Sequence, residues 1–176
     1  MRVFVLCTGR CGSMTFERAC RHCANYTSGH ESGRRTKYSL QYPDRHIEID
    51  NRLAWFLGRL HELYPRAYYV HLLRKAADVS RSYAARGAAE DTKILHGFIR
   101  AIKQGRHAGL PAEARRLVAT LEANIRHFLQ GKPHMVINIE TAADSFPTFW
   151  KRIAAEGDLA AARAELRLHR NRGPAG

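Results

Sequence analysis

Short apolar runs alternate with longer amphipathic stretches along the chain. The apolar runs are rich in β-branched and aromatic residues, as buried strands are, and they span residues 2–7, 67–73 and 134–139, with a weaker candidate at 24–29. The amphipathic stretches repeat their apolar positions at helical spacing and cover residues 13–23, 52–64, 76–86, 90–104, 112–130, 144–156 and 158–169. Strands that alternate with helices predict a three-layer α/β fold, in which helices flank a parallel sheet of about four strands.

Capping residues indicate where two of the helices begin. Ser13 is expected to cap the first helix, and Asp50 or Asn51 the second. In the second helix, Trp55 and Phe56 occupy positions typical of core packing, and the alternative is that they line a ligand pocket.

The first strand leads into a glycine-containing turn, TGRCGS, at residues 8–13. The helix that follows presents free backbone N–H groups and the positive end of its dipole, which favour an anion. Gly9 and Gly12 let the backbone approach a ligand, and Arg10 adds a planar, permanent charge. Because each charge-assisted hydrogen bond contributes about 1.5–3 kcal/mol, several of them on one phosphate make a strong site.

A second anion-binding position is predicted at the end of the strand at 67–73. Arg74 follows this strand, and Ser82 lies about two turns into the next helix, on the same face as Asp78. Ligands of parallel sheets bind at the carboxyl ends of the strands. The spacing therefore permits Arg74 and Ser82 to hold one phosphate between them.

The turn at residues 8–13 differs from the ATP- or GTP-binding P-loop. It is shorter than G-x-x-x-x-G-K-[ST], and it has no Lys-Ser or Lys-Thr pair. The strand at 67–73 ends in Arg74, where P-loop enzymes usually place a metal-binding aspartate. The sequence therefore predicts direct binding of an anion without a metal.

Composition favours a single domain, residues 1–176, whose net positive charge attracts anions. Of the 176 residues 45% are hydrophobic, and the formal net charge is +13, a field that attracts nucleotides, nucleic acid, acidic glycans or lipid headgroups without choosing among them. All cysteines fall in the first 23 residues and cannot tie distant loops together, so we expect reduced thiols, no zinc site and a cytoplasmic protein. No apolar run is long enough to cross a membrane.

Two motifs, in this order, resemble those of the sulfotransferases that use 3′-phosphoadenosine-5′-phosphosulfate (PAPS). The first strand and turn match the family's P-loop-like motif, Arg/Lys-x-Gly-[Ser/Thr]-x-[Ser/Thr/aromatic], and LLRKAADVSRSY matches its second motif through Arg74, Asp78, Val79, Ser82 and Tyr83. The late stretch VINIETAADSFPTFWKRI also looks like the strand, Glu and helix that follow in the family, so the resemblance spans residues 3 to about 156. Lys75 departs from the common Asn or Asp, and NRGPAG only faintly echoes the usual C-terminal Arg-Lys-Gly segment.

The resemblance implies a P-loop-like sulfotransferase topology and a role for each motif. The 5′-phosphosulfate would be held by the consecutive residues Arg10, Cys11, Gly12, Ser13, Met14 and Thr15, and the 3′-phosphate by Arg74 and Ser82. Arg10 would also act in catalysis, by neutralising charge on the departing 5′-phosphate. The donor would be PAPS, the product PAP (adenosine 3′,5′-bisphosphate), and the acceptor a hydroxyl or amine of a small molecule or glycan.

The family uses a His or a Glu as general base. Glu31 is the first candidate here and His30 the second, and Glu48 and Asp50 remain open. The alternative for Glu31 is a loop carboxylate paired with Arg34 or Arg35 in the polar loop at residues 30–45.

Other functions stay open beside sulfuryl transfer. A P-loop nucleotide kinase would share the sheet and the turn but would require ATP and magnesium. A nucleic-acid-binding module would place aromatics within one basic face, whereas the arginines here are spread over many helices. An inactive relative would bind a nucleotide or polyanion without turnover.

Overall fold

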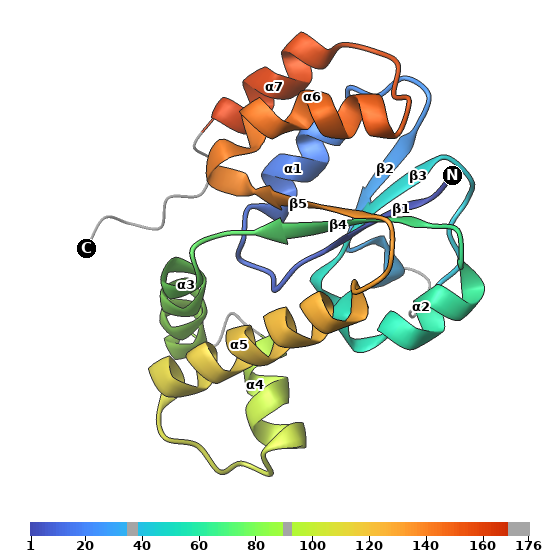
Figure 1. Cartoon of the computed structure of the whole chain (residues 1–176). Helices are drawn as coiled ribbons and strands as arrows, with labels where there is room; N and C mark the ends of the chain where they lie inside the picture. Colours follow the sequence, from blue (N-terminus) through green and yellow to red (C-terminus); the bar gives the residue numbers. More distant parts are fainter. Residues whose placement is uncertain (35–38, 90–92, 169–176) are drawn as a thin grey trace.

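A computed structural model of the chain describes residues 1–34, 39–89 and 93–168. In these ranges five strands form a parallel sheet in the order β2-β3-β1-β4-β5 (Figure 1). The strands are β1 (Val3–Leu6), β2 (Thr27–His30), β3 (His46–Ile49), β4 (Tyr68–Leu73) and β5 (His134–Asn138). β1 lies at the centre and is fully buried, as an apolar strand covered on both faces should be.

Helices cover both faces of the sheet (Figure 1). On one face lie α1 (Ser13–Cys20), α6 (Ala142–Arg152) and α7 (Leu159–Arg167). On the other lie α2 (Leu57–Leu63), α3 (Ala76–Ala88), α4 (Lys93–Gly97) and α5 (Leu110–Phe128). The short helices are the 3₁₀ turns η1 (Ser32–Arg34), η2 (Asn51–Trp55) and η4 (Ile139–Thr141) and the π-helix η3 (Phe98–Ile102). This arrangement confirms the predicted α/β fold with three layers.

The sheet contains one strand that the hydrophobic pattern does not reveal. Every residue of β3 is buried, yet His46 and Glu48 alternate with its apolar residues. Burial is possible because His46 Nε2 lies 2.9 Å from Glu48 Oε2, and the Ser32 backbone N–H donates to Glu48 Oε1 at 2.8 Å. The sheet therefore has five strands where about four were predicted, because the polar residues of the additional strand are buried with hydrogen-bond partners.

Two predicted helices are interrupted. The helix expected over 52–64 divides at Phe56 into η2, which Asp50 caps, and α2. The helix expected over 90–104 appears as α4 and then η3, and its residues 90–92 lie outside the described part of the chain, as do residue 169 and the NRGPAG segment. In the described ranges, no helix combines the length and the apolar character needed to cross a bilayer.

Candidate active site

The loop between β1 and α1 turns through three left-handed residues. Gly9, Arg10 and Gly12 have φ angles of 78°, 57° and 85°, a region that L side chains rarely adopt. A Cβ added to Gly12 would lie 2.5 Å from Ile139 Cγ1, which is closer than any normal contact. Glycine at position 12 is therefore required both by its backbone conformation and by the packing of Ile139.

Ser13 does not cap α1 as predicted. Gly12 occupies the N-cap position, and within the described residues no side chain caps this helix. The first helical hydrogen bond runs from the Phe16 N–H to the Gly12 carbonyl at 3.0 Å, so the N–H groups of residues 13–15 have no partner within the helix. The Ser13 hydroxyl is instead 3.0 Å from His30 Nε2, so it links the loop to the end of β2.

The side chains of the loop divide into buried and exposed ones. Cys11 is fully buried beside Cys7, and a hydrogen bond between the two thiols lowers the pKa of Cys11 and raises that of Cys7. Thr15 is buried, whereas Met14 is 47% exposed. Cys11 therefore presents its backbone rather than its thiol to a ligand, and all four cysteines of the chain are free and buried.

The structure brings the two predicted anion-binding positions together. β1 and β4 are neighbours, with Leu6 paired to His71, so their carboxyl ends lie side by side. Arg10 Nε donates to Ser82 Oγ at 3.0 Å, and Arg74 Nη1 donates to the Arg10 carbonyl at 3.3 Å. Two guanidinium groups and a hydroxyl thus meet at the carboxyl ends of the strands, beside the N-terminus of α1, where an anion is favoured.

Tyr83 and Asp78, the other residues of the second motif, have structural contacts. The Tyr83 hydroxyl donates to the Thr8 carbonyl at 2.7 Å and so fixes the start of the loop. Burial raises the pKa of Tyr83, which therefore keeps the proton that it donates. Asp78 accepts from the exposed Arg81 at 2.7 Å, next to the site rather than within it.

The two leading candidates for the general base lie at the end of β2. Glu31 Oε2 is 2.6 Å from Arg52 Nη1, and the Glu31 backbone N–H donates to the Ile49 carbonyl at 3.0 Å. Arg52 is thus one partner of Glu31, and the pairing with Arg34 or Arg35 that the sequence suggested falls on side chains outside the described part of the chain. Burial lowers the pKa of His30, so the imidazole beside Ser13 is neutral near pH 7 and able to accept a proton.

Glu48 and Asp50 have different environments although both are fully buried. Both oxygens of Glu48 accept hydrogen bonds from Ser32, so Glu48 ties η1 to β3. Asp50 Oδ1 accepts from the Arg52 backbone N–H at 2.8 Å, while its Oδ2 is buried with no hydrogen-bond partner among the described residues. Burial raises the pKa of Asp50 to about 6, a perturbation that pattern reading could not foresee because β3 itself was not predicted.

The helical spacing predicted that Trp55 packs in the core, but Trp55 is at the surface. Its side chain is 43% exposed, and with the partly buried Phe56 it lines a pocket together with Arg52. Trp55 therefore fits the pocket alternative better than core packing, whereas Phe56 both packs against the core and lines the pocket.

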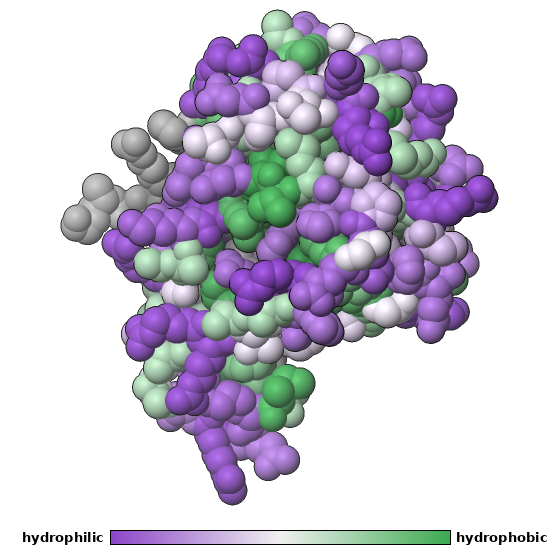
Figure 2. Space-filling model, in the orientation of Figure 1, coloured by the Kyte–Doolittle hydropathy of each residue, from purple (hydrophilic) through white to green (hydrophobic). Residues whose placement is uncertain are grey.

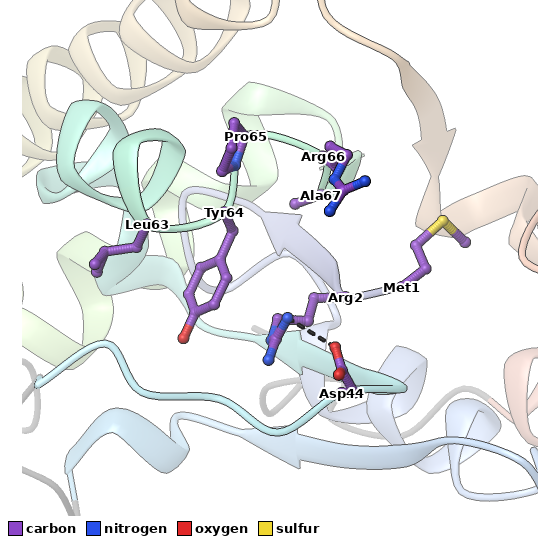
Figure 3. A pocket seen from close by; sticks show the side chains of 8 residues that line it. All are labelled: Met1, Arg2, Asp44, Leu63, Tyr64, Pro65, Arg66 and Ala67. Atoms are coloured by element: carbon purple, nitrogen blue, oxygen red, sulfur yellow. Dashed lines mark ion pairs between the residues drawn. The ribbon is translucent and has the colours of Figure 1, made fainter.

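A different pocket lies at the amino ends of the strands and takes no part in this site. It has a volume of about 290 Å³ and is lined by Arg2 and Ala67, which precede β1 and β4, and by Tyr64 and Asp44 (Figure 3). Arg2 pairs with Asp44 at 2.7 Å, as the dashed line in Figure 3 shows, and its guanidinium lies 4.7 Å from the centre of the Tyr64 ring. These contacts close the amino ends of the strands, whereas Arg10, Arg74 and Ser82 gather at the carboxyl ends.

Comparison with known proteins finds likeness in structure only. No family model and no curated protein sequence matches the chain. A sulfotransferase from Alicyclobacillus acidocaldarius matches with a TM-score of 0.59 at 14% identity, over 93% of this chain and 88% of that one. The mouse sulfotransferase SULT7A1, solved in complex with PAP, matches with a TM-score of 0.57 at 9% identity, over 94% of this chain and 63% of that one. The chain has the sulfotransferase fold.

Proposed function

We propose that the protein is a sulfotransferase that moves a sulfuryl group from PAPS to an oxygen or nitrogen of an acceptor. The observation that carries the proposal is the junction of Arg10, Arg74 and Ser82 at the adjoining ends of β1 and β4. The fold of two sulfotransferases, one of them bound to PAP, supports the same reaction class.

The residues at the junction fit a nucleotide with phosphate groups at both its 5′ and 3′ positions. The loop after β1, with Arg10 and the first N–H groups of α1, suits the 5′-phosphosulfate. Arg74 and Ser82 suit the 3′-phosphate, because the Ser82 hydroxyl accepts from Arg10 and keeps its own proton for donation to a phosphate oxygen. Arg74 supplies a planar fork that matches phosphate geometry.

In the proposed reaction the donor supplies an activated sulfuryl group and a phosphate as leaving group. Arg10 and the N–H groups of residues 13–15 stabilise the negative charge that develops on the departing 5′-phosphate. The sulfur–oxygen bond to this phosphate breaks and leaves its electron pair there, while a new bond forms between sulfur and the acceptor atom.

A base at the end of β2 takes the acceptor's proton. Glu31 is the proposed base, because its carboxylate lies at the carboxyl edge of the sheet and Arg52 holds it in place at 2.6 Å. His30 contacts Ser13 of the loop and is the alternative, since a neutral imidazole can also accept a proton.

Thermal unfolding with nucleotides tests the proposal. PAP is expected to raise the melting temperature in the absence of magnesium, and ATP with magnesium to raise it much less, because ATP lacks the 3′-phosphate that the proposed site at Arg74 and Ser82 would bind. Stabilisation by ATP that depends on magnesium, with none by PAP, would favour a kinase instead. If PAP stabilises the protein but no acceptor from a broad panel is sulfated, the protein binds nucleotide without turnover.

A further inference from the structure

An apolar groove of about 340 Å³ lies between η2 and the continuous pair α4–η3. Trp55 and Phe56 form one wall, and Phe98 and Ile102 belong to the other. Trp55 and Ile102 are 43% and 62% exposed, unusual values for large apolar side chains, and Figure 2 shows apolar atoms at the surface over α4. A π-helix such as η3 is rare and often accompanies a functional site.

Arg52 connects the groove to the proposed active site. Arg52 lines the groove and holds Glu31 at 2.6 Å, and His30, next to Glu31, contacts Ser13 of the anion-binding loop. A molecule lying in the groove would therefore direct its polar end towards Glu31 and the loop, with its apolar part between Trp55 and Ile102.

We infer that this groove binds the acceptor, and that the acceptor is a small, largely apolar molecule with one hydroxyl group, such as an aromatic alcohol. This inference rests on the proposed function. The volume suits a small molecule. Apart from Arg52 and Lys93, every side chain along the groove is apolar, so a sugar would lose water from several hydroxyls without gaining partners. The formal net charge of +13 suits an acidic or glycan-like acceptor but also follows from binding a highly anionic donor, and the groove favours an apolar acceptor.

The proton and the sulfuryl group have defined destinations in this arrangement. The acceptor's hydroxyl proton passes to the Glu31 carboxylate, and its oxygen forms the new bond to sulfur. The bond between sulfur and the 5′-phosphate oxygen breaks, and its electron pair leaves with the bisphosphate product.

Gly97 allows the groove to be filled without disturbing the fold. It lines the groove in a helical conformation, with φ −61° and ψ −43°, and a Cβ added there meets none of the described atoms within 4 Å. Leucine at this position fits the helix better than glycine and would project into the groove. Gly58, an exposed residue of α2 whose added Cβ likewise meets no described atom within 4 Å, provides the matched control.

The experiment is a calorimetric titration of 2-naphthol, and in parallel of methyl glucoside, into the protein saturated with PAP. We expect 2-naphthol to bind the wild type and Gly58→Leu equally, and Gly97→Leu about tenfold or more weakly, with PAP affinity unchanged in all three. Ile102→Ser is a second test in case Gly97→Leu does not fold. It changes an exposed side chain and should also weaken 2-naphthol binding.

Three results would overturn the inference: naphthol binding that neither Gly97→Leu nor Ile102→Ser changes, tighter binding of the glucoside than of naphthol, or a dimer in light scattering that Gly97→Leu dissociates. Failure of PAP to bind would instead contradict the proposed function. In that case the naphthol titration without nucleotide still shows whether the groove binds an aromatic alcohol.

Discussion

Replacing Arg74 with alanine should selectively weaken the binding of a nucleotide that carries a 3′-phosphate. Arg74 stands at the end of β4 and donates to the Arg10 carbonyl at 3.3 Å, so its guanidinium is already directed towards the loop. Arg74→Ala removes this guanidinium and leaves the Ser82 hydroxyl in place.

The size of the loss follows from the hydrogen bonds that a guanidinium forms with a phosphate. Two charge-assisted bonds of about 1.5–3 kcal/mol each give a range of about 3–6 kcal/mol. Because Arg74 is only half-buried, solvent reduces this to about 2–4 kcal/mol, or about 30- to 700-fold in the dissociation constant. AMP lacks the 3′-phosphate, so its affinity should change by less than about threefold.

The assay is isothermal titration of PAP and of AMP, at one ionic strength, into the wild type, Arg74→Ala and Arg81→Ala. Arg81 is a matched control, because it lies on α3, carries the same charge and pairs with Asp78 at 2.7 Å at the surface. Equal losses for PAP and AMP would mean that Arg74 only supports the loop through Arg10. If Arg81→Ala loses as much PAP affinity as Arg74→Ala, the loss comes from the change in net charge and not from a contact of Arg74 with the 3′-phosphate.

Three further predictions concern the base, the loop and the buried acid. Glu31→Gln should lower turnover with the identified acceptor at least about a hundredfold with PAP affinity unchanged, whereas Glu62→Gln, in an exposed ion pair with Arg59, should lower neither; full activity of Glu31→Gln would exclude it as base. Tyr83→Phe should lower the free energy of unfolding in urea by about 1–3 kcal/mol, because the buried Thr8 carbonyl loses its partner, and no loss would refute that role of the hydroxyl. The pKa of Asp50 is raised from 3.8 to about 6, which corresponds to about 3 kcal/mol of stability that falls away as pH rises from 4 to 6; Asp50→Asn should flatten this part of the pH profile of urea unfolding, and an unchanged slope would contradict the assignment.

Much of the fold and the meeting of Arg10 with Ser82 could be predicted from the sequence, because those features depend on local patterns. An apolar strand followed by a glycine-containing turn, and a strand that ends in Arg74, need no distant information. Parallel pairing then places the two strand ends side by side, as the contact between Arg10 and Ser82 shows.

The remainder depends on pairs of residues that only the folded chain brings together. His46 and Glu48 conceal β3 from a search for apolar runs, because their polar groups are satisfied by each other and by Ser32. The pairing of Glu31 with Arg52 and the exposure of Trp55 also follow from where β3 and η2 lie. Without β3, neither the neighbours of Glu31 nor the groove could be inferred.

Two buried thiols, Cys7 directly after β1 and Cys11 in the loop before α1, can report local opening of this part of the chain. Cys7 and Cys11 have no solvent-accessible surface, so an alkylating reagent can reach them only when the loop moves away from the sheet. Cys23, which follows α1 and forms an isolated β-bridge with Gly157, samples a separate opening. The ratio of alkylation rates at Cys11 and Cys23, read by mass spectrometry, therefore measures how much a bound ligand reduces opening of the loop, without any cysteine having to be engineered into the chain.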